Sequence, residues 1–204
     1  MNHDPAKTLI YHITDVENLP GILAERGLHS DAAMATKNPA VVIGYDHIKQ
    51  RRLKELKVNC CKGRFVGEFV PFYFCPRSPM LYVINRGNTG RSQSTVVHLV
   101  STMEAGMALD RAWAISDRNA GAAYASFYSN VEALSRLDWN AIRATDWKGK
   151  TSQKCAEFLV ADFFPWSSIQ TIGCHNTTVV ARVNDMLNSA QHKPVVTVEQ
   201  SWYY

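Results

Sequence analysis

The chain has 204 residues, of which 46% are hydrophobic and 20% are charged, and its formal net charge at pH 7 is +4. This composition is typical of a soluble globular protein and excludes extensive disorder. Because no apolar run approaches the roughly 18 residues that cross a bilayer, the polar start is not a signal peptide and no long linker divides the sequence, we expect a single cytoplasmic domain over 1–204 without a membrane segment.

The cysteines and histidines form neither a disulfide framework nor a metal-binding pattern. The five cysteines are odd in number and contain no C-x-x-C pair, and the seven histidines lack metal-ligand spacing. We therefore expect reduced thiols and no bound metal.

Positive charge gathers in one segment. Between His47 and Arg64, seven basic side chains stand against one acidic side chain, a local charge of +6, so the remaining residues together carry −2. Such a segment suits an anionic partner, either a nucleic acid or the phosphates of a dinucleotide. The alternative is an ordinary solvated helix face.

In chain order, the first predicted strand covers 8–13 and leads through Thr14 and Asp15, both suitable helix caps, into a helix over 18–26. His12 stands at the end of this strand, where side chains and free backbone N–H groups can meet a ligand. A hydrogen-bonded structural histidine is the alternative. Residues 28–44 lack periodicity and are predicted to form a loop that could cover a cleft.

The middle of the chain is predicted to contain short elements. We expect a basic helix over 45–58, an aromatic strand over 68–76, strands over 95–100 and 113–116, and a short helix over 103–109. Pro71 lacks a backbone donor, so the aromatic strand should run along an edge or contain a bulge. The loop over 86–92 could cradle a phosphate, although it lacks P-loop spacing. A long connection over 117–147, with a helix over 130–137, is of a length that usually has a function.

A short apolar run holds one carboxylate. Residues 153–165 are rich in Val, Phe and Leu and end at a proline, which is typical of a strand buried on at least one face. Under strict alternation Glu157 lies on the same side as Leu159 and opposite Phe158. A buried ionised glutamate is costly unless something needs it, so Glu157 is the catalytic candidate. The alternatives are that this side faces solvent or that a neighbouring arginine satisfies the carboxylate.

The last elements complete the prediction of fold class. A strand is predicted over 169–174, a helix over 177–189 and a final strand over 195–199. Because the strands do not alternate regularly with long helices, the sequence favours an α+β domain with largely antiparallel sheets over a doubly wound fold.

Several short stretches follow one another in order along the chain: Tyr11-His12-Ile13-Thr14 with Asn18-Leu19-Pro20, Val70-Pro71-Phe72-Tyr73-Phe74 with Arg77-Ser78-Pro79-Met80-Leu81, Leu137-Asp138-Trp139, and Ala156-Glu157-Phe158-Leu159-Val160. Taken together, these stretches resemble the DarT family of DNA ADP-ribosyltransferase toxins. The ordered set spans nearly the whole chain. The resemblance implies an ADP-ribosyltransferase-like fold, with two small antiparallel sheets split by an NAD cleft and with peripheral helices.

The same resemblance implies the reaction. Members of the family transfer ADP-ribose from the co-substrate NAD to a base in single-stranded DNA, and this sequence looks closer to the thymine-modifying branch. Such toxins are normally paired with a macrodomain antitoxin. Two other classes stay open. One is an ADP-ribosyltransferase that acts on guanine in DNA, on RNA or on protein, and the other is a non-catalytic module that binds single-stranded nucleic acid and ignores NAD.

Matching positions imply the site residues. Glu157 would stabilise the positive charge that develops on the ribose as nicotinamide leaves, and it could accept the proton of a thymine ring nitrogen. Arg51 would hold NAD and steady the developing charge. The other NAD-binding candidates are His12, Thr14, Asn18 and Tyr73, and the candidates for contact with the DNA strand are Arg118, Asn119, Tyr124, Tyr128 and Lys154.

Two positions depart from the family pattern. Asn119 stands where a histidine is expected, and Cys155 stands where a glutamine is common. If that histidine helps to place the substrate, Asn119 could alter the preferred DNA sequence or weaken activity. Neither change should remove the function.

Overall fold

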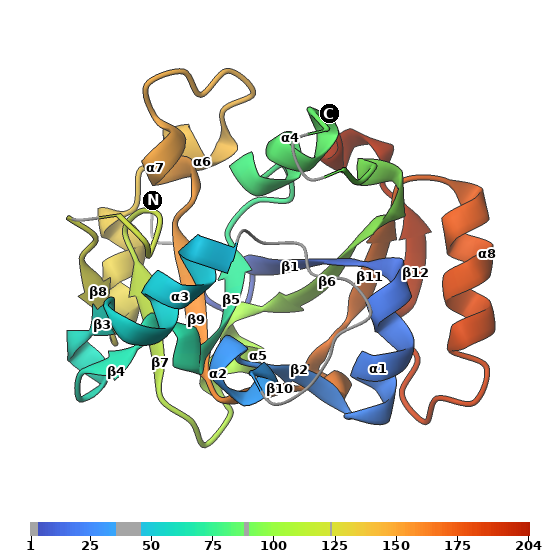
Figure 1. The fold of residues 1–204 in the computed structure, drawn as a ribbon, viewed down its shortest axis with the longest axis horizontal. Helices are drawn as coiled ribbons and strands as arrows, with labels where there is room; N and C mark the ends of the chain where they lie inside the picture. The colour runs from blue at the N-terminus through green and yellow to red at the C-terminus, as the bar shows by residue number, and fades with distance from the viewer. Residues whose placement is uncertain (1–3, 36–45, 88–89, 123) are drawn as a thin grey trace.

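The computed structural model describes residues 4–35, 46–87, 90–122 and 124–204. In these ranges an eight-stranded sheet has the order β12-β11-β6-β1-β5-β9-β7-β8, and two two-stranded sheets, β10-β2 and β3-β4, accompany it. Figure 1 shows the large sheet running through the molecule, with α8 outside its β12 end. The predicted α+β class is confirmed, and the pairing is antiparallel except between β11 and β12.

The elements within the described residues are short. The strands are β1 Leu9–Asp15, β2 Gly27–His29, β3 Lys57–Val58, β4 Arg64–Phe65, β5 Phe69–Tyr73, β6 Val96–Thr102, β7 Trp113–Ser116, β8 Phe127–Tyr128, β9 Glu157–Ala161, β10 Phe163–Pro165, β11 Thr171–Cys174 and β12 Val195–Val198. The helices are α1 Leu19–Ala24, α2 Asp31–Met34, α3 Asp46–Lys54, α4 Pro79–Asn85, α5 Met103–Met107, α6 Trp139–Arg143, α7 Thr151–Lys154 and α8 Thr177–Met186. None of these helices has the length and apolar character that crossing a membrane requires.

The large sheet consists of two halves that meet at one residue pair. β1 pairs with β6 along its whole length, but it pairs with β5 only at Tyr11 and Tyr73. The resemblance implied two small antiparallel sheets. Their counterparts here are the halves β12-β11-β6-β1 and β5-β9-β7-β8, which this narrow junction joins into one sheet.

Pro71 lies in β5, near the point where the two halves separate. The Asp162 N–H donates to the Glu68 carbonyl at 2.8 Å, so every second residue counted from Glu68 directs its backbone groups toward β9. Pro71 is not one of these residues, and its backbone faces β1 instead. Because β1 has diverged from β5 at this point, the missing N–H of Pro71 costs no hydrogen bond between strands. The predicted edge or bulge is thus an edge-like position inside a central strand.

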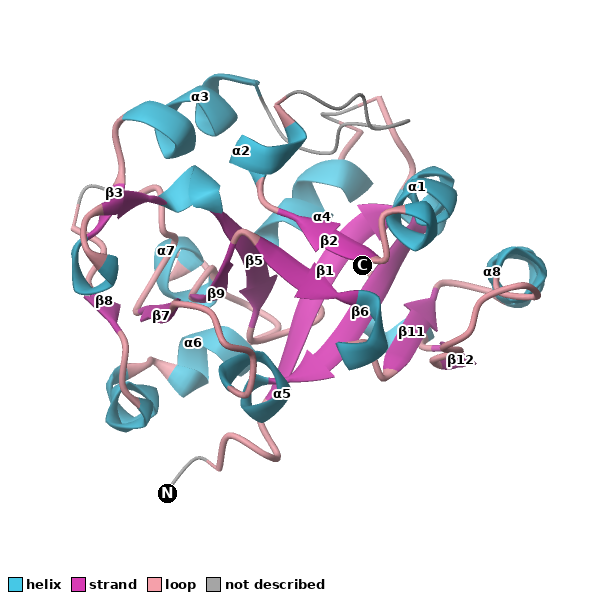
Figure 2. Cartoon of the chain, turned by 90° about the horizontal axis from the view of Figure 1, so that it is seen from below, coloured by secondary structure: helices cyan, strands magenta, loops and turns pink. Residues whose placement is uncertain are grey.

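Apolar residues cover both faces of the half that contains β9. The main core lies on one face, and a smaller cluster that includes Phe69, Ala114 and Leu159 lies on the other. All five residues of β9 are buried. Figure 2 shows α3 on one side of β5 and β9 and α5 on the other. A residue at the start of β9 is therefore enclosed from both sides.

Three predicted segments differ from the structure. The predicted loop over 28–44 contains β2 and α2, and its residues 36–44 lie outside the described ranges. The basic helix expected over 45–58 ends at Lys54, and Lys57 already belongs to β3. The connection over 117–147 contains the helix expected over 130–137, as a 3-10 helix over Val131–Arg136, and also β8 and α6, which were not predicted. Elements of two to six residues are too short to produce a readable periodicity.

Candidate active site

Glu157 is the first residue of β9, the strand that pairs with β5 on one side and β7 on the other. The residue is only 2% exposed. The alternation predicted from the sequence is confirmed, because Phe158 belongs to the main core and Leu159 to the smaller cluster on the opposite face. Glu157 therefore enters the face that α3 covers.

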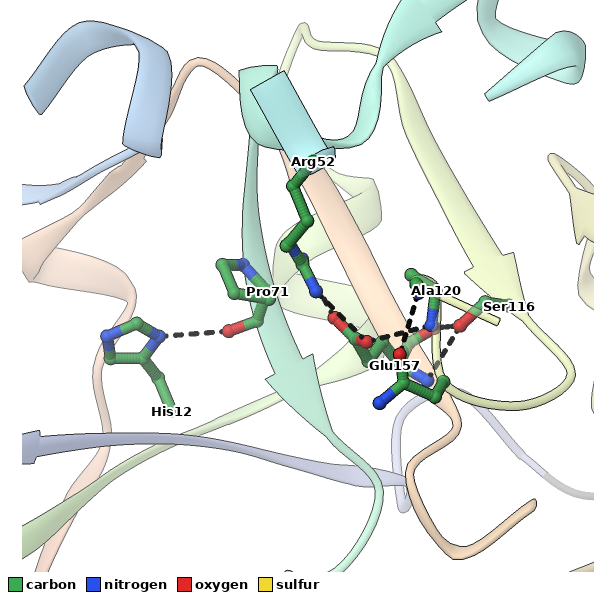
Figure 3. A network of polar contacts seen from close by, with 8 residues as sticks. His12, Arg52, Pro71, Ser116, Ala120 and Glu157 are labelled. Carbon is green, nitrogen blue, oxygen red and sulfur yellow. Dashed lines mark hydrogen bonds and ion pairs between the residues drawn. The ribbon is translucent and has the colours of Figure 1, made fainter. Parts of the chain in front are cut away.

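Two groups, the Arg52 guanidinium and the Ala120 N–H, hold the Glu157 carboxylate through three hydrogen bonds (Figure 3). The Arg52 guanidinium donates from one nitrogen to Oε1 at 3.3 Å and from the other to Oε2 at 3.0 Å. The backbone N–H of Ala120 also donates to Oε1, at 3.0 Å. The Ser116 hydroxyl on β7 accepts from the Glu157 N–H at 3.0 Å and so fixes the backbone below the side chain. The carboxylate has one orientation, set from a helix, a loop and a neighbouring strand.

The cation at the carboxylate is Arg52, whereas the sequence predicted Arg51. Neighbouring residues on a helix point in directions about 100° apart, so only one of two adjacent arginines can face β9. The Arg51 side chain is 49% exposed and pairs with Glu55 on the helix surface at 3.4 Å. The Arg52 side chain is 12% exposed. Arg51, expected to hold NAD and to steady the developing charge, lies outside this ion pair, and Arg52 is the arginine at the carboxylate.

Burial and charge act in opposite directions on Arg52. Burial by itself would lower the pKa of the guanidinium, but the charge of Glu157 and the hydrogen bonds to it raise the pKa above its ordinary value. A cation and an anion that share two parallel hydrogen bonds offset much of the cost of removing each from water. An ionised pair can therefore persist at a site that is almost closed to solvent.

His12 lies where β1 leaves β5. Its Nδ1 atom is 2.9 Å from the carbonyl oxygen of Pro71 (Figure 3). Because a carbonyl can only accept, Nδ1 carries the proton and Nε2 has a free lone pair. Burial lowers the pKa of His12, so the ring is neutral at pH 7. His12 can offer a hydrogen-bond acceptor to a ligand at the junction of the two halves.

Thr14 and Asn18, two other predicted NAD ligands, lie next to each other after His12. The Asn18 amide donates to the Thr14 hydroxyl at 3.1 Å. Asp15 between them caps the turn that follows, since its carboxylate accepts from the Glu17 N–H at 3.0 Å. The end of β1 and the start of α1 thus bring His12, Thr14 and Asn18 to one end of a strand.

Tyr73, the last predicted NAD ligand, belongs to the Glu157 environment. Its backbone pairs with Glu157 across the β5–β9 ladder. Burial raises the pKa of its phenol well above the ordinary value, and the nearby Cys155 and Glu157 add to this effect. Tyr73 is neutral and can act as a hydrogen-bond donor beside the carboxylate.

The predicted DNA contacts on the connection after β7 differ in accessibility. Tyr124 is 86% exposed. Arg118 is bound to the neighbouring Asp117 carboxylate through two hydrogen bonds of 3.2 Å. The half-buried Tyr128 ring has the Arg136 guanidinium 5.1 Å from its centre. Asn119 is held inside the loop by the Gly121 N–H, which donates to its side-chain oxygen at 2.7 Å.

Lys154 is buried, which corrects the prediction that it contacts DNA. The residue is 2% exposed, and its ammonium donates to the carbonyls of Ile142 and Ala144, both at 2.8 Å. These carbonyls stand at the end of α6, where a helix leaves acceptors unpaired. Burial lowers the pKa of Lys154. Its role is to join α7 to the end of α6.

Sequence reasoning missed three groups that hold Glu157: Arg52 and the Ala120 N–H at the carboxylate, and Ser116 at the backbone N–H. Arg52 belongs to the basic segment, but the narrow apolar stripe of that helix does not fix which arginine faces the sheet. The Ala120 N–H could not be predicted from the sequence, because every residue except proline has a backbone N–H. The pairing of Ser116 with Glu157 depends on strand register, which a single sequence does not give. Among the described residues, no three His, Cys, Asp or Glu side chains form a group that could bind a metal ion.

Comparison with known proteins finds matches over almost the whole chain. The family model described as "DarT: ssDNA thymidine ADP-ribosyltransferase, DarT" matches residues 11–204. A DNA ADP-ribosyl transferase of Thermus aquaticus is 39% identical over 206 residues, which cover 98% of this chain and 90% of the relative.

Two solved structures of Thermus sp. 2.9 DarT have the same fold. The complex with ADP-ribosylated ssDNA gives a TM-score of 0.92 at 35% identity and covers 100% of this chain and 99% of that chain. The complex with NAD⁺ gives a TM-score of 0.88 at 34% identity and covers 100% of both chains. Our chain therefore belongs to the DarT family, and it is an NAD-dependent DNA ADP-ribosyltransferase.

Proposed function

We propose that this enzyme transfers ADP-ribose from NAD to a thymine base in single-stranded DNA and releases nicotinamide. The description of the family and the two Thermus complexes, with NAD⁺ and with ADP-ribosylated ssDNA, support the assignment. In this chain the observation that carries it is the buried Glu157 carboxylate, held at the start of β9 by Arg52 and the Ala120 N–H. A non-catalytic binding module would have no need of such a carboxylate.

The proposed chemistry is a displacement at the ribose carbon. The bond from that carbon to the nicotinamide nitrogen breaks, and positive charge develops on the ribose. The thymine ring nitrogen forms the new bond to the same carbon and loses its proton. In our proposal Glu157 stabilises the ribose charge and accepts this proton. Because its orientation is already fixed, little reorganisation is needed as the charge develops.

His12, Thr14, Asn18 and Tyr73 are the proposed NAD ligands. The neutral His12 ring offers its Nε2 lone pair to a donor such as a ribose hydroxyl or an amide. Thr14 and Asn18 supply a hydroxyl and an amide at the same strand end. Arg52 takes over the role first predicted for Arg51, since it is the arginine that reaches the carboxylate.

The proposed acceptor must be unpaired. The thymine ring nitrogen that carries a proton lies on the Watson–Crick edge, so a duplex hides it, and extrusion of the base would cost a few kcal/mol. The exposed Tyr124 ring suits stacking with a splayed base, and Tyr128 and Arg118 lie on the same connection. For Arg118 to meet a phosphate it must exchange its bond to Asp117.

We further propose that 1–204 acts as one domain in the cytoplasm, as the toxin of a pair with a macrodomain antitoxin. The family resemblance supports this pairing. Co-expression with a macrodomain that removes ADP-ribose from DNA should relieve growth inhibition caused by the wild-type enzyme. Relief by a hydrolytically inactive macrodomain would instead indicate simple binding.

The acceptor can be tested with labelled NAD. Matched oligonucleotides, single-stranded and duplex, are offered with each thymine replaced in turn by uracil, cytosine or guanine, alongside RNA and protein. Mass spectrometry then maps the modified base. We expect labelling of thymine in single strands only. Efficient labelling of the duplex, of guanine in strands without thymine, or of RNA or protein would contradict the proposal.

A further inference from the structure

The backbone and the side-chain oxygen of Asn119 have partners inside the protein. Its N–H donates to the Ser152 carbonyl at 2.8 Å, and its carbonyl accepts from the Ala122 N–H at 2.9 Å. Its side-chain oxygen accepts from the Gly121 N–H at 2.7 Å. The Asn119 side chain also favours the ionised form of the Cys155 thiol and so lowers the pKa of that thiol. The side-chain oxygen is thus committed to the loop and is not available to a DNA base.

These bonds surround Ala120. A hydrogen bond from the N–H of residue i+2 to an asparagine side chain forms a tight turn that fixes the peptide between them. That peptide carries the buried Ala120, whose N–H donates to Glu157 Oε1 at 3.0 Å. The direction of this donor is therefore set by the Asn119 side chain.

Cys155 attaches the turn to the segment that leads into β9. It lies two residues before Glu157 and is buried. Burial and then the charge of Glu157 raise the pKa of its thiol to about 12, so the thiol is uncharged and can accept from the Asn119 amide. Together with the bond to Ser152, this contact joins two segments that supply the carboxylate and its donor, although Ala120 and Glu157 are 37 residues apart.

We propose that Asn119 is a positioning residue for the Glu157 carboxylate, that it acts through the Ala120 N–H, and that Cys155 is its partner. This inference rests on the proposed catalytic role of Glu157. It replaces the predicted contact of Asn119 with DNA. It also places the two departures from the family pattern, Asn119 and Cys155, in one hydrogen-bonded unit.

The first test is Asn119→Ala, measured as kcat, KM for each substrate and the thermal midpoint of unfolding. We expect kcat to fall roughly 10-fold, since a mispositioned donor to a buried charge is worth about one such factor, with KM for DNA unchanged. A role in DNA binding would instead raise KM for DNA, and a purely structural role would lower the thermal midpoint of unfolding without lowering kcat of the folded enzyme.

Two further variants disturb the contacts of Asn119 but keep the Asn119 side chain itself. In Gly121→Ala the new Cβ would lie 2.9 Å from the Asn119 side-chain oxygen, so the turn must open, and kcat should fall in the same way. Cys155→Ala should have a smaller effect, and the double variant with Asn119→Ala should be no worse than Asn119→Ala alone, as expected for residues that act as one unit.

The matched control is Asn176→Ala. Asn176 caps α8 by accepting from the Val179 N–H at 3.0 Å, so its loss removes a similar bond far from the carboxylate. It should lower the thermal midpoint and leave kcat unchanged. If Asn119→Ala instead raises KM for DNA and leaves kcat unchanged, Asn119 contacts DNA and our inference is wrong.

Glu157→Gln separates this inference from the proposed function. If E157Q stays active, the proposed role of Glu157 fails and the positioning role fails with it. If E157Q is inactive while Asn119→Ala and Gly121→Ala both keep the wild-type kcat, only the positioning role fails.

Discussion

Each half of the large sheet contains a buried polar residue, and the two are held in different ways. His98 on β6 is fully buried among the rings of Tyr11, Trp202 and Tyr203. Its Nε2 donates to the Pro76 carbonyl at 2.9 Å, and its Nδ1 is 3.3 Å from the Tyr203 hydroxyl. Glu157 on β9 is held by a charged arginine and a loop N–H.

The difference lies in the charge of the partners. His98 is neutral, its partners are neutral, and aromatic rings close around it, which is the pattern of a residue that stabilises a fold. Glu157 is the acidic member of an ion pair assembled from separate segments. Replacing such a pair by apolar residues often stabilises a protein, so its presence indicates a role other than stability. Burial alone does not distinguish the two residues, but the partners do.

The comparison is tested most strongly by Glu157→Gln. The amide keeps the shape and can still accept from Arg52 and Ala120, but it cannot stabilise the ribose charge as an anion. We expect transfer of ADP-ribose to fall by about 10²-fold or more with the fold intact. Transfer of label from NAD to single-stranded DNA measures the rate, and circular dichroism checks folding.

Glu55→Gln is the matched control, because Glu55 also pairs with an arginine, the exposed Arg51 of α3, but does so on the protein surface. It should keep the wild-type rate. Equal rates for the Glu157 and Glu55 variants would remove the catalytic role of Glu157.

Arg52→Lys should be the next largest effect. An ammonium cannot make the two parallel bonds that the guanidinium makes to Glu157, so we expect a loss of about 10- to 100-fold in kcat/KM. Arg51→Lys should stay within about two-fold of wild type, since exposed pairs contribute little. Steady-state kinetics of both variants decide between the arginines. Loss on Arg51→Lys with an active Arg52→Lys would restore the original prediction.

The His98 half of the comparison predicts a loss of stability in acid. Burial lowers the pKa of His98 to about 4, below the value near 6.5 that it has in the unfolded chain. The unfolded state then binds more protons between these values, so the stabilisation is complete above pH 6.5 and is lost as the pH falls toward 4. At pH 5 the loss from this residue should be about 2 kcal/mol.

Urea unfolding of wild type and His98→Gln at pH 7 and pH 5 measures this loss. The variant should lose less stability between the two pH values than wild type does. His29→Gln, at a histidine that pairs with Glu25, should lose as much as wild type. The same pH dependence in His98→Gln and wild type would contradict the assignment.

Tyr203→Phe should have the smallest effect and should separate stability from activity. The Tyr203 hydroxyl donates to the Val96 carbonyl at 2.8 Å, so its removal should cost about 1 kcal/mol of unfolding free energy. The ring contacts remain, and kcat should be unchanged. A fall in kcat without a fall in thermal midpoint would show that the Tyr203 hydroxyl acts in the reaction.

The sequence predicted the elements that have strong local patterns. The apolar alternation around Glu157 and the Asp15 cap of the turn before α1 were readable because each depends on residues close in the chain. Alternation alone placed Glu157 on the side of Leu159 and opposite Phe158, but it did not show whether that side is buried. These local patterns predicted much of the fold and the main catalytic candidate, Glu157.

What remained unpredicted depends on contacts between distant segments. Whether Arg51 or Arg52 meets β9 depends on the rotation of α3 about its axis, and a narrow apolar stripe does not define that rotation. Lys154 looked like a surface cation because its sequence neighbours do not reveal the end of α6. Tertiary contacts decided both cases.

The span of the Glu157 contacts along the chain links activity to the completion of folding. Arg52 and Glu157 are 105 residues apart, and such a pair forms only after the intervening chain has been ordered. The carboxylate site therefore assembles when β9 enters between β5 and β7, and a nascent or partly folded chain contains no working site. Any variant that raises the unfolded fraction therefore lowers the concentration of active DNA-modifying enzyme in proportion, even when the substituted residue lies outside the site.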